Sequence, residues 1–174
     1  MAGDQALYDA LAACAQGWVT STMPKTPHTN DLNVDNILSY LSPSAQISWG
    51  HTTFVSSKPG LQGTKSPNEF IQHLTSMSPN LATWRIELTD VVVDVRKKSA
   101  VVRADFHMLV KGEGVEPVLN DILFWVGMEE TEEGVKVIKS IEFIDPTAGA
   151  ELGKTMMKSS GVDGPVPKAV RKEE

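Results

Sequence analysis

The stretch AVVRADFHMLVKGEGVEPVLNDILFWVGM, residues 100–128, decides the fold that the sequence predicts. In its first part, small or apolar side chains alternate with Arg103, Asp105 and His107. A period of two is typical of a β-strand that buries one face. The glycines of KGEG mark a hairpin turn, and the apolar run after Pro117 predicts a second strand antiparallel to the first.

The rest of the chain extends this hairpin into a sheet and adds helices before and after it. Runs rich in Val, Ile, Phe and Trp, separated by RKKS, KGEG and EETEEG, predict four long antiparallel strands at residues 82–96, 100–111, 117–130 and 134–144. Apolar residues at helical spacing predict helices at residues 4–23, 32–41, 66–77 and 146–158. A short strand, Ala45–Trp49, is expected between the second and third helices.

Two of these helices carry capping signals. Asp4 is a candidate N-cap for the first helix. For the third helix, Ser66 is the expected cap, Pro67 takes the first helical position and Glu69 completes a capping box. The order of elements predicts an α+β fold in which helices cover one face of a strongly curved antiparallel sheet, with a short C-terminal helix. We expect one domain over residues 1–158 and a disordered tail over residues 159–174.

Composition excludes several classes of partner. With 22 acidic against 16 basic residues, the net charge of -6 would repel nucleic acid and anionic membranes. Cys14 is the single cysteine, so the sequence offers no internal disulfide and no thiolate metal cage. The four histidines form no metal-binding motif, and we expect neither a metal nor a cofactor. No apolar run has the roughly 20 residues of a spanning helix, and the first residues lack a positive signal-peptide region, so we expect a cytoplasmic protein.

The helix pattern, the segment SPSAQISW…LQG…NEFIQHL and the hairpin that ends in EEGVKVIKSIEF together resemble the NTF2-like superfamily, and within it the SnoaL-like cyclases and isomerases. The resemblance covers about residues 4–145. It implies a cone of three N-terminal helices packed on the curved sheet, with a closed apolar end and an open mouth. It also implies a small hydrophobic substrate and a homodimer that packs through the outer face of the sheet.

Two candidate catalytic residues follow from this resemblance. Asp121 interrupts an apolar strand, where a buried anion must be paired, hydrogen-bonded or protonated. Its spacing from Gly112 is similar to that of the neutral acid of ketosteroid isomerase, which implies that Asp121 points into the cavity with Leu123 and Trp125. At the end of the short strand Trp49 stands where ketosteroid isomerase has its general base, so His51 becomes the candidate base or acid.

The predicted cavity wall consists of aromatic side chains, namely Trp18, Tyr40, Trp49, Trp84, Phe106 and Trp125. Two questions of strand parity stay open. Asp105 and His107 are predicted on the outer face, but they would replace Asp121 and His51 as the acid-base pair if that assignment were inverted. In the last strand, either Lys139, Ile141 and Phe143 or Ile138, Ser140, Glu142 and Ile144 face inward.

The predicted function is a cofactor-independent isomerase or cyclase of polyketide- or meroterpenoid-type metabolism, working by general acid-base catalysis in a Trp-lined pocket. A dehydratase or hydrolase on the same scaffold is one alternative. A non-catalytic module for small-molecule binding or dimerisation is the other, because one fold hosts many functions.

Overall fold

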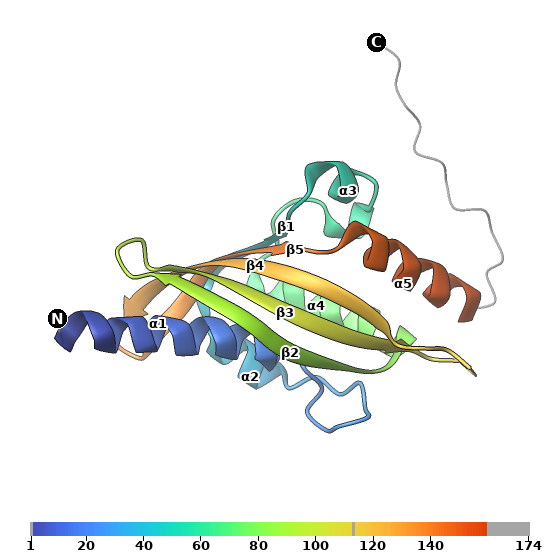
Figure 1. Ribbon diagram of the computed structural model, residues 1–174, viewed down its shortest axis with the longest axis horizontal. Helices are drawn as coiled ribbons and strands as arrows, with labels where there is room; N and C mark the ends of the chain where they lie inside the picture. The colour runs from blue at the N-terminus through green and yellow to red at the C-terminus, as the bar shows by residue number, and fades with distance from the viewer. Residues whose placement is uncertain (1, 113, 160–174) are drawn as a thin grey trace, which may run out of the picture.

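One curved sheet organises residues 2–112 and 114–159, which the computed structural model describes (Figure 1). Its strand order is β1-β5-β4-β3-β2, and the strands are β1 (Leu41–Trp49), β2 (Leu81–Asp94), β3 (Ser99–Val110), β4 (Val118–Thr131) and β5 (Gly134–Phe143). β2 to β5 form the predicted antiparallel meander. β1 extends the sheet by pairing parallel to β5. The predicted α+β fold is confirmed.

The helices of this fold are α1 (Ala2–Ser21), α2 (Val34–Ser39), α3 (Thr52–Ser56), α4 (Pro67–Met77) and α5 (Pro146–Ser159), with 3-10 turns at Pro59–Leu61 (η1) and Ser78–Asn80 (η2). The four predicted helices are present, although α2 is shorter than expected, and α3 lies where a loop was predicted. The predicted cap at Asp4 is wrong, because α1 begins at Ala2 and Asp4 lies within its first turn. A carboxylate there still faces the positive end of the helix dipole. Apart from Ser159, the predicted tail lies outside the described residues.

The helices bury one face of the sheet. α1 packs against β2, β3 and β5, α4 packs against β1, and α5 packs against β3 and β4. The predicted inward residues of β3 are buried there, namely Val102, Ala104, Phe106 and Met108. Arg103, Asp105 and His107 lie on the opposite face, as the alternation predicted. No described helix combines the length and apolarity needed to cross a membrane.

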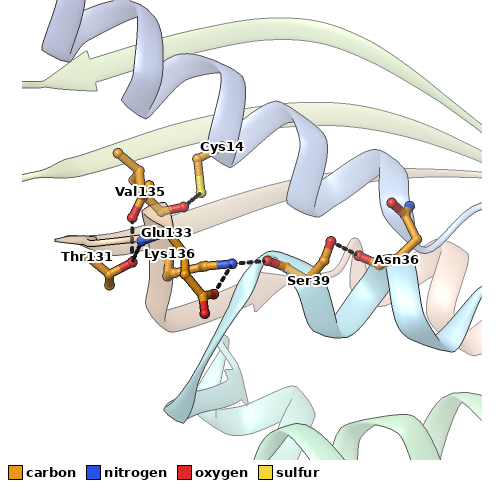
Figure 2. Close-up of polar contacts among 8 residues, drawn as sticks. Cys14, Asn36, Ser39, Thr131, Glu133, Val135 and Lys136 are labelled. Atoms are coloured by element: carbon orange, nitrogen blue, oxygen red, sulfur yellow. Dashed lines mark hydrogen bonds and ion pairs between the residues drawn. The ribbon is translucent and has the colours of Figure 1, made fainter.

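Polar contacts hold the β4–β5 hairpin against α1 and α2 at one end of the sheet (Figure 2). The Lys136 ammonium group donates a 2.7 Å hydrogen bond to the Ser39 carbonyl and lies 3.4 Å from the Glu133 carboxylate. The Cys14 thiol donates to the Val135 carbonyl at 3.3 Å, and burial raises the pKa of this thiol to about 11 despite the nearby Lys136. Cys14 is therefore a protonated packing residue at neutral pH.

α4 begins with the predicted capping box. The Ser66 hydroxyl accepts from the Glu69 amide, and the Glu69 carboxylate accepts from the Ser66 amide at 2.8 Å. These bonds satisfy two amide groups at the start of a helix that lies behind the sheet in Figure 1 and carries Phe70, His73 and Leu74 towards it. The cap therefore fixes where these three side chains lie.

We expect Ser66→Ala to lower the free energy of unfolding by about 1 kcal/mol in chemical denaturation, because the Glu69 amide loses its acceptor. Ser76→Ala is the matched control, since Ser76 is an exposed residue of the same helix and bonds only to the His73 carbonyl among the described residues. If the two variants lost the same free energy of unfolding, the proposed role of the Ser66 cap would be contradicted.

Candidate active site

A cavity of about 380 Å³ lies between the inner face of the sheet and the helices α1, α3, α4 and α5. A volume of this size suits a small organic molecule. Aromatic side chains form much of its wall, namely Trp18, Trp49, Phe54, Phe70, Trp84, Phe106 and Phe124. The polar side chains along it are few, which gives each of them a strong influence on how a ligand would bind.

Four of the predicted wall residues, Trp18, Trp49, Trp84 and Phe106, lie in this wall. The indoles of Trp18 and Trp84 use their N–H groups to bond with groups outside the cavity chemistry. Trp18 donates to the Ser140 hydroxyl at 3.1 Å, and Trp84 donates to the Thr22 carbonyl at 2.9 Å. An indole has a single donor, so Trp18 and Trp84 offer a ligand only their apolar surfaces.

Tyr40 and Trp125 do not line the cavity, contrary to prediction. The Tyr40 ring lies against Gly17 of α1, so closely that a Cβ atom at Gly17 would clash with it. Trp125 lies on the outer face of the sheet, where the Lys139 ammonium is 5.6 Å from the centre of its ring. Trp125 faces outward because it is paired with Val101, which has the same parity as Arg103.

The predicted inward placement of Asp121 is also wrong. Asp121 is paired directly with Asp105 across β3 and β4, and residues directly opposite each other share a face. On the outer face, Arg103 donates to its two carboxylate oxygens at 3.0 and 2.5 Å. This bidentate bond holds the pKa of Asp121 below its ordinary value, so the carboxylate is ionised at neutral pH.

His51 accompanies Asp121 on that outer side rather than at the cavity mouth. It is exposed, with a left-handed backbone at φ 59°, and its ring packs roughly perpendicular to the Phe143 ring, with the ring centres 5.4 Å apart. His51, Arg103, Asp121, Leu123, Phe143 and Asp145 line a separate hollow. The two predicted catalytic residues therefore lie near each other, but on the face opposite the Trp-lined cavity.

The acid that does line the cavity is Glu142, in the strand whose parity the sequence left open. Ser140, Glu142 and Ile144 face inward, whereas Lys139 faces outward. In the parallel pairing of β1 with β5, Trp49 lies directly beside Glu142. The Gly50 amide donates to the Glu142 carbonyl at 2.8 Å, and the Phe143 ring occupies the space that a side chain at residue 50 would need.

The Glu142 carboxyl group has an unusual environment for an acid. Although the residue keeps some accessible area because the cavity is open, protein surrounds the carboxyl group itself, and this burial raises its pKa to about 7. A side-chain hydrogen bond from Trp49 acts in the opposite direction by favouring the carboxylate. Both protonation states of Glu142 are therefore accessible near neutral pH.

His73 lines the same cavity from α4. Its imidazole ring lies 4.9 Å from the Trp49 ring, measured between ring centres. Burial lowers the pKa of His73, and Lys65 lowers it further, so the imidazole is neutral at pH 7. Trp49 thus contacts both titratable groups, one through a hydrogen bond and one through its ring.

Asn120 is another polar residue on the cavity wall, and it is 3% exposed. Its side-chain oxygen accepts from the Asp145 amide at 3.2 Å, which fixes the orientation of the side-chain amide. Among the described residues the Nδ2 group has no acceptor, which leaves it as a donor for a bound molecule. The register of β3 and β4 that turns Asp121 outward also turns Asn120 inward, because it pairs Asn120 with the inward residue Phe106. Among the described residues, no three His, Cys, Asp or Glu side chains come together as a metal site would require.

Solved structures share this arrangement of helices and sheet, whereas no family model and no curated protein matches the chain. BvnE pinacolase from Penicillium brevicompactum superposes with a TM-score of 0.69 and 13% identity over 88% of this chain and 99% of that one. PrhC from Penicillium brasilianum superposes with a TM-score of 0.68 and 15% identity, over 90% of this chain and 94% of that one. A ketosteroid isomerase-like protein from Erwinia carotovora superposes with a TM-score of 0.51 and 13% identity, over 78% of this chain and 94% of that one. The chain has the NTF2-like fold.

The NTF2-like fold confirms the architecture that the resemblance implied. At identities of 13–15%, the likeness concerns the path of the backbone and not the residues of a site. The chemistry of the cavity has therefore to be argued from Glu142, His73 and Asn120 themselves.

The pKa of Glu142 predicts how stability depends on pH. In the fold this carboxyl keeps its proton up to about pH 7, whereas an ordinary glutamate releases it near 4.5, so the free energy of unfolding should fall as pH rises through that window. Glu142→Gln preserves the shape of the neutral acid and cannot ionise. In urea denaturation we expect the variant to match wild type near pH 4 and to exceed it near pH 8 by on the order of 3 kcal/mol. A difference that does not change with pH would contradict the raised pKa.

Proposed function

We propose that the protein is a cofactor-independent isomerase or cyclase that acts on an apolar small molecule of the polyketide or terpenoid type, with Glu142 as its general acid and base. The observation that supports this most is a carboxyl group in an aromatic cavity with a pKa of about 7. General acid-base catalysis is most efficient when the pKa lies near the working pH, because both protonation states are then populated.

In the proposed reaction, the ionised Glu142 takes a proton from a carbon or hydroxyl of the substrate. The same carboxyl group then returns that proton to another atom of the rearranged molecule. The proton balance closes without a co-reactant, so product and substrate have the same mass. Trp49 stabilises the carboxylate before the first transfer and after the second by donating its indole hydrogen bond.

Other cavity residues would support the charge that develops on the substrate. The Nδ2 group of Asn120 can donate to a carbonyl or enolate oxygen, and a fixed donor of this kind stabilises negative charge in a site that excludes water. Neutral His73 can accept or donate a hydrogen bond on the Trp49 side of the cavity. The faces of Trp18 and Trp84 can shelter a cationic intermediate through their π electrons.

The role of Glu142 predicts the effect of two matched substitutions. Glu142→Gln should reduce turnover of a converted precursor by a factor on the order of 10² or more, because the amide cannot carry the proton. Asp121→Asn, which neutralises an acid on the outer face, should leave turnover within about twofold. Both are measured by liquid chromatography and mass spectrometry of precursor mixtures, in which an isomerised product changes retention at constant mass.

Loss of activity in Asp121→Asn but not in Glu142→Gln would contradict the proposal and restore the outer-face pair. A product lighter by one water would favour the dehydratase alternative with the same acid. If wild type binds apolar precursors and converts none, a binding module is the better description of the cavity.

We also propose that the protein forms a homodimer through the outer face of the sheet. Leu119 and Leu123 are 52% and 39% exposed there, and Trp125, Ile141 and Phe143 extend the apolar surface across β4 and β5. Exposed apolar area of this kind is typical of a protein contact, and a two-fold axis places such a patch against itself.

Leu123→Glu should convert the dimer to a monomer in size-exclusion chromatography with light scattering, because two carboxylates would be buried across the axis. Tyr8→Glu is the control, since Tyr8 is an exposed aromatic residue of α1, on the other side of the sheet. A wild-type monomer, or a dimer that survives Leu123→Glu, would rule out this interface.

A further inference from the structure

The edge of the cavity carries a charged side chain that the proposed proton transfers do not use. Lys58, which lies between α3 and η1, lines the cavity together with Pro59 and Gly60 of η1. Pro59 and Gly60 are exposed and Lys58 is half-buried, so this segment forms a rim between the cavity and solvent. α5 adjoins this rim, because Gly149 lies against the Phe54 ring, and α3 and α5 are neighbours in Figure 1.

Within the described residues, Lys58 has no carboxylate partner. Its ammonium group lies 5.7 Å from the centre of the Phe54 ring, which is a weak cation-π contact. A half-buried ammonium gains more from an anion than a fully solvated one does, because water screens the interaction less. Lys58 is therefore a cation on a cavity wall without an anion to balance it in the part of the chain that the structure describes.

The acid of the cavity does not fill that role. Burial and the Trp49 hydrogen bond account for the behaviour of Glu142, and Lys58 is not among the groups that act on it. A second lysine, Lys65, lies 5.7 Å from the Trp49 ring and adds positive potential on the α3–α4 side. The cavity thus has a proton-transfer group on β5 and a separate positive end at its rim.

We propose that the substrate of this cavity carries an anionic group, such as a carboxylate or an ionised enol, which Lys58 binds at the rim while the apolar body lies between the aromatic walls. This inference rests on the proposed function in that it takes the cavity to be the active site. The protein has a net charge of -6 and repels anions at long range, so binding of an anion requires a local cation of this kind. The ion pair fixes one end of the substrate and so determines which of its atoms reaches Glu142.

The test uses two fluorescent probes that differ by one charged group. One is 8-anilinonaphthalene-1-sulfonate, and the other is its neutral analogue N-phenyl-1-naphthylamine, both titrated into wild type and variants. We expect Lys58→Gln to weaken binding of the sulfonate roughly tenfold or more, as for loss of a charge-assisted bond, and to leave the neutral probe within about twofold. Lys58→Arg should retain the preference for the sulfonate.

Lys154→Gln is the matched control, because it removes the same charge from an exposed position of α5 that does not line the cavity. Equal effects of Lys58→Gln and Lys154→Gln on the sulfonate would overturn the proposal, since only the net charge would then matter. Equal weakening of both probes by Lys58→Gln would overturn it too, because the apolar wall would be the cause.

The proposed function and this inference fail in different experiments. Glu142→Gln should keep the sulfonate preference while it loses turnover. A fully active Glu142→Gln that still prefers the sulfonate contradicts the catalytic acid alone. An inactive Glu142→Gln in a protein without preference for the sulfonate contradicts the anionic substrate alone.

Discussion

The parallel pairing of β1 with β5, which sets Trp49 beside Glu142, is the constraint on which the candidate site depends. The Gly50 amide holds the Glu142 carbonyl, and the Phe143 ring fills the space above Gly50, so the register at this point has little freedom. A shift of one residue would turn Glu142 to the outer face and bring Phe143 inward. Together with the register of β4, which sets the inward Phe124 opposite Glu142, this pairing decides that the cavity contains an acid.

The consequence of this pairing is chemical as well as geometric. A carboxyl group among aromatic side chains resists ionisation because water is excluded, and the Trp49 indole offsets part of that resistance. The same indole contacts His73, so α4, β1 and β5 meet at one side chain. Because burial raises the pKa of this acid, its ionisation at high pH lowers the free energy of unfolding. Titratable groups that are kept at such a cost in stability are typical of functional sites.

Much of the fold could be predicted from local patterns. The period of two around Phe106 and the capping box at Ser66 are short-range signals, and both elements form as expected. The site could not be predicted in the same way, because it depends on parity. Asn120 and Asp121 are adjacent polar residues in one apolar strand, and the register with β3 alone decides that Asn120 faces the cavity. Pairing the strands first would have placed Asp121 with Asp105 on the outer face.

Glu142 was missed for a related reason. The last strand alternates in a way that allows either face to be buried, and its inward face is fixed by contacts with Trp49 and Trp18, far away in the sequence. An acid within an apolar strand is the signal that indicates the site, but both Asp121 in β4 and Glu142 in β5 show it. The two acids differ in their strand pairing and not in their sequence surroundings. Arg103 keeps Asp121 ionised on the outer face, whereas burial raises the pKa of Glu142 on the inner face.

The most direct test of this account is the titration of the Glu142 carboxyl group itself. In protein labelled with ¹³C at the glutamate side-chain carboxyl, the resonance that Glu142→Gln removes is assigned to Glu142 and followed by NMR as pH is changed. The account predicts a midpoint near 7, because protein surrounds this carboxyl. A midpoint near the ordinary glutamate value of 4.5 would mean that water solvates the carboxyl group, and the proposed acid-base role would lose its basis.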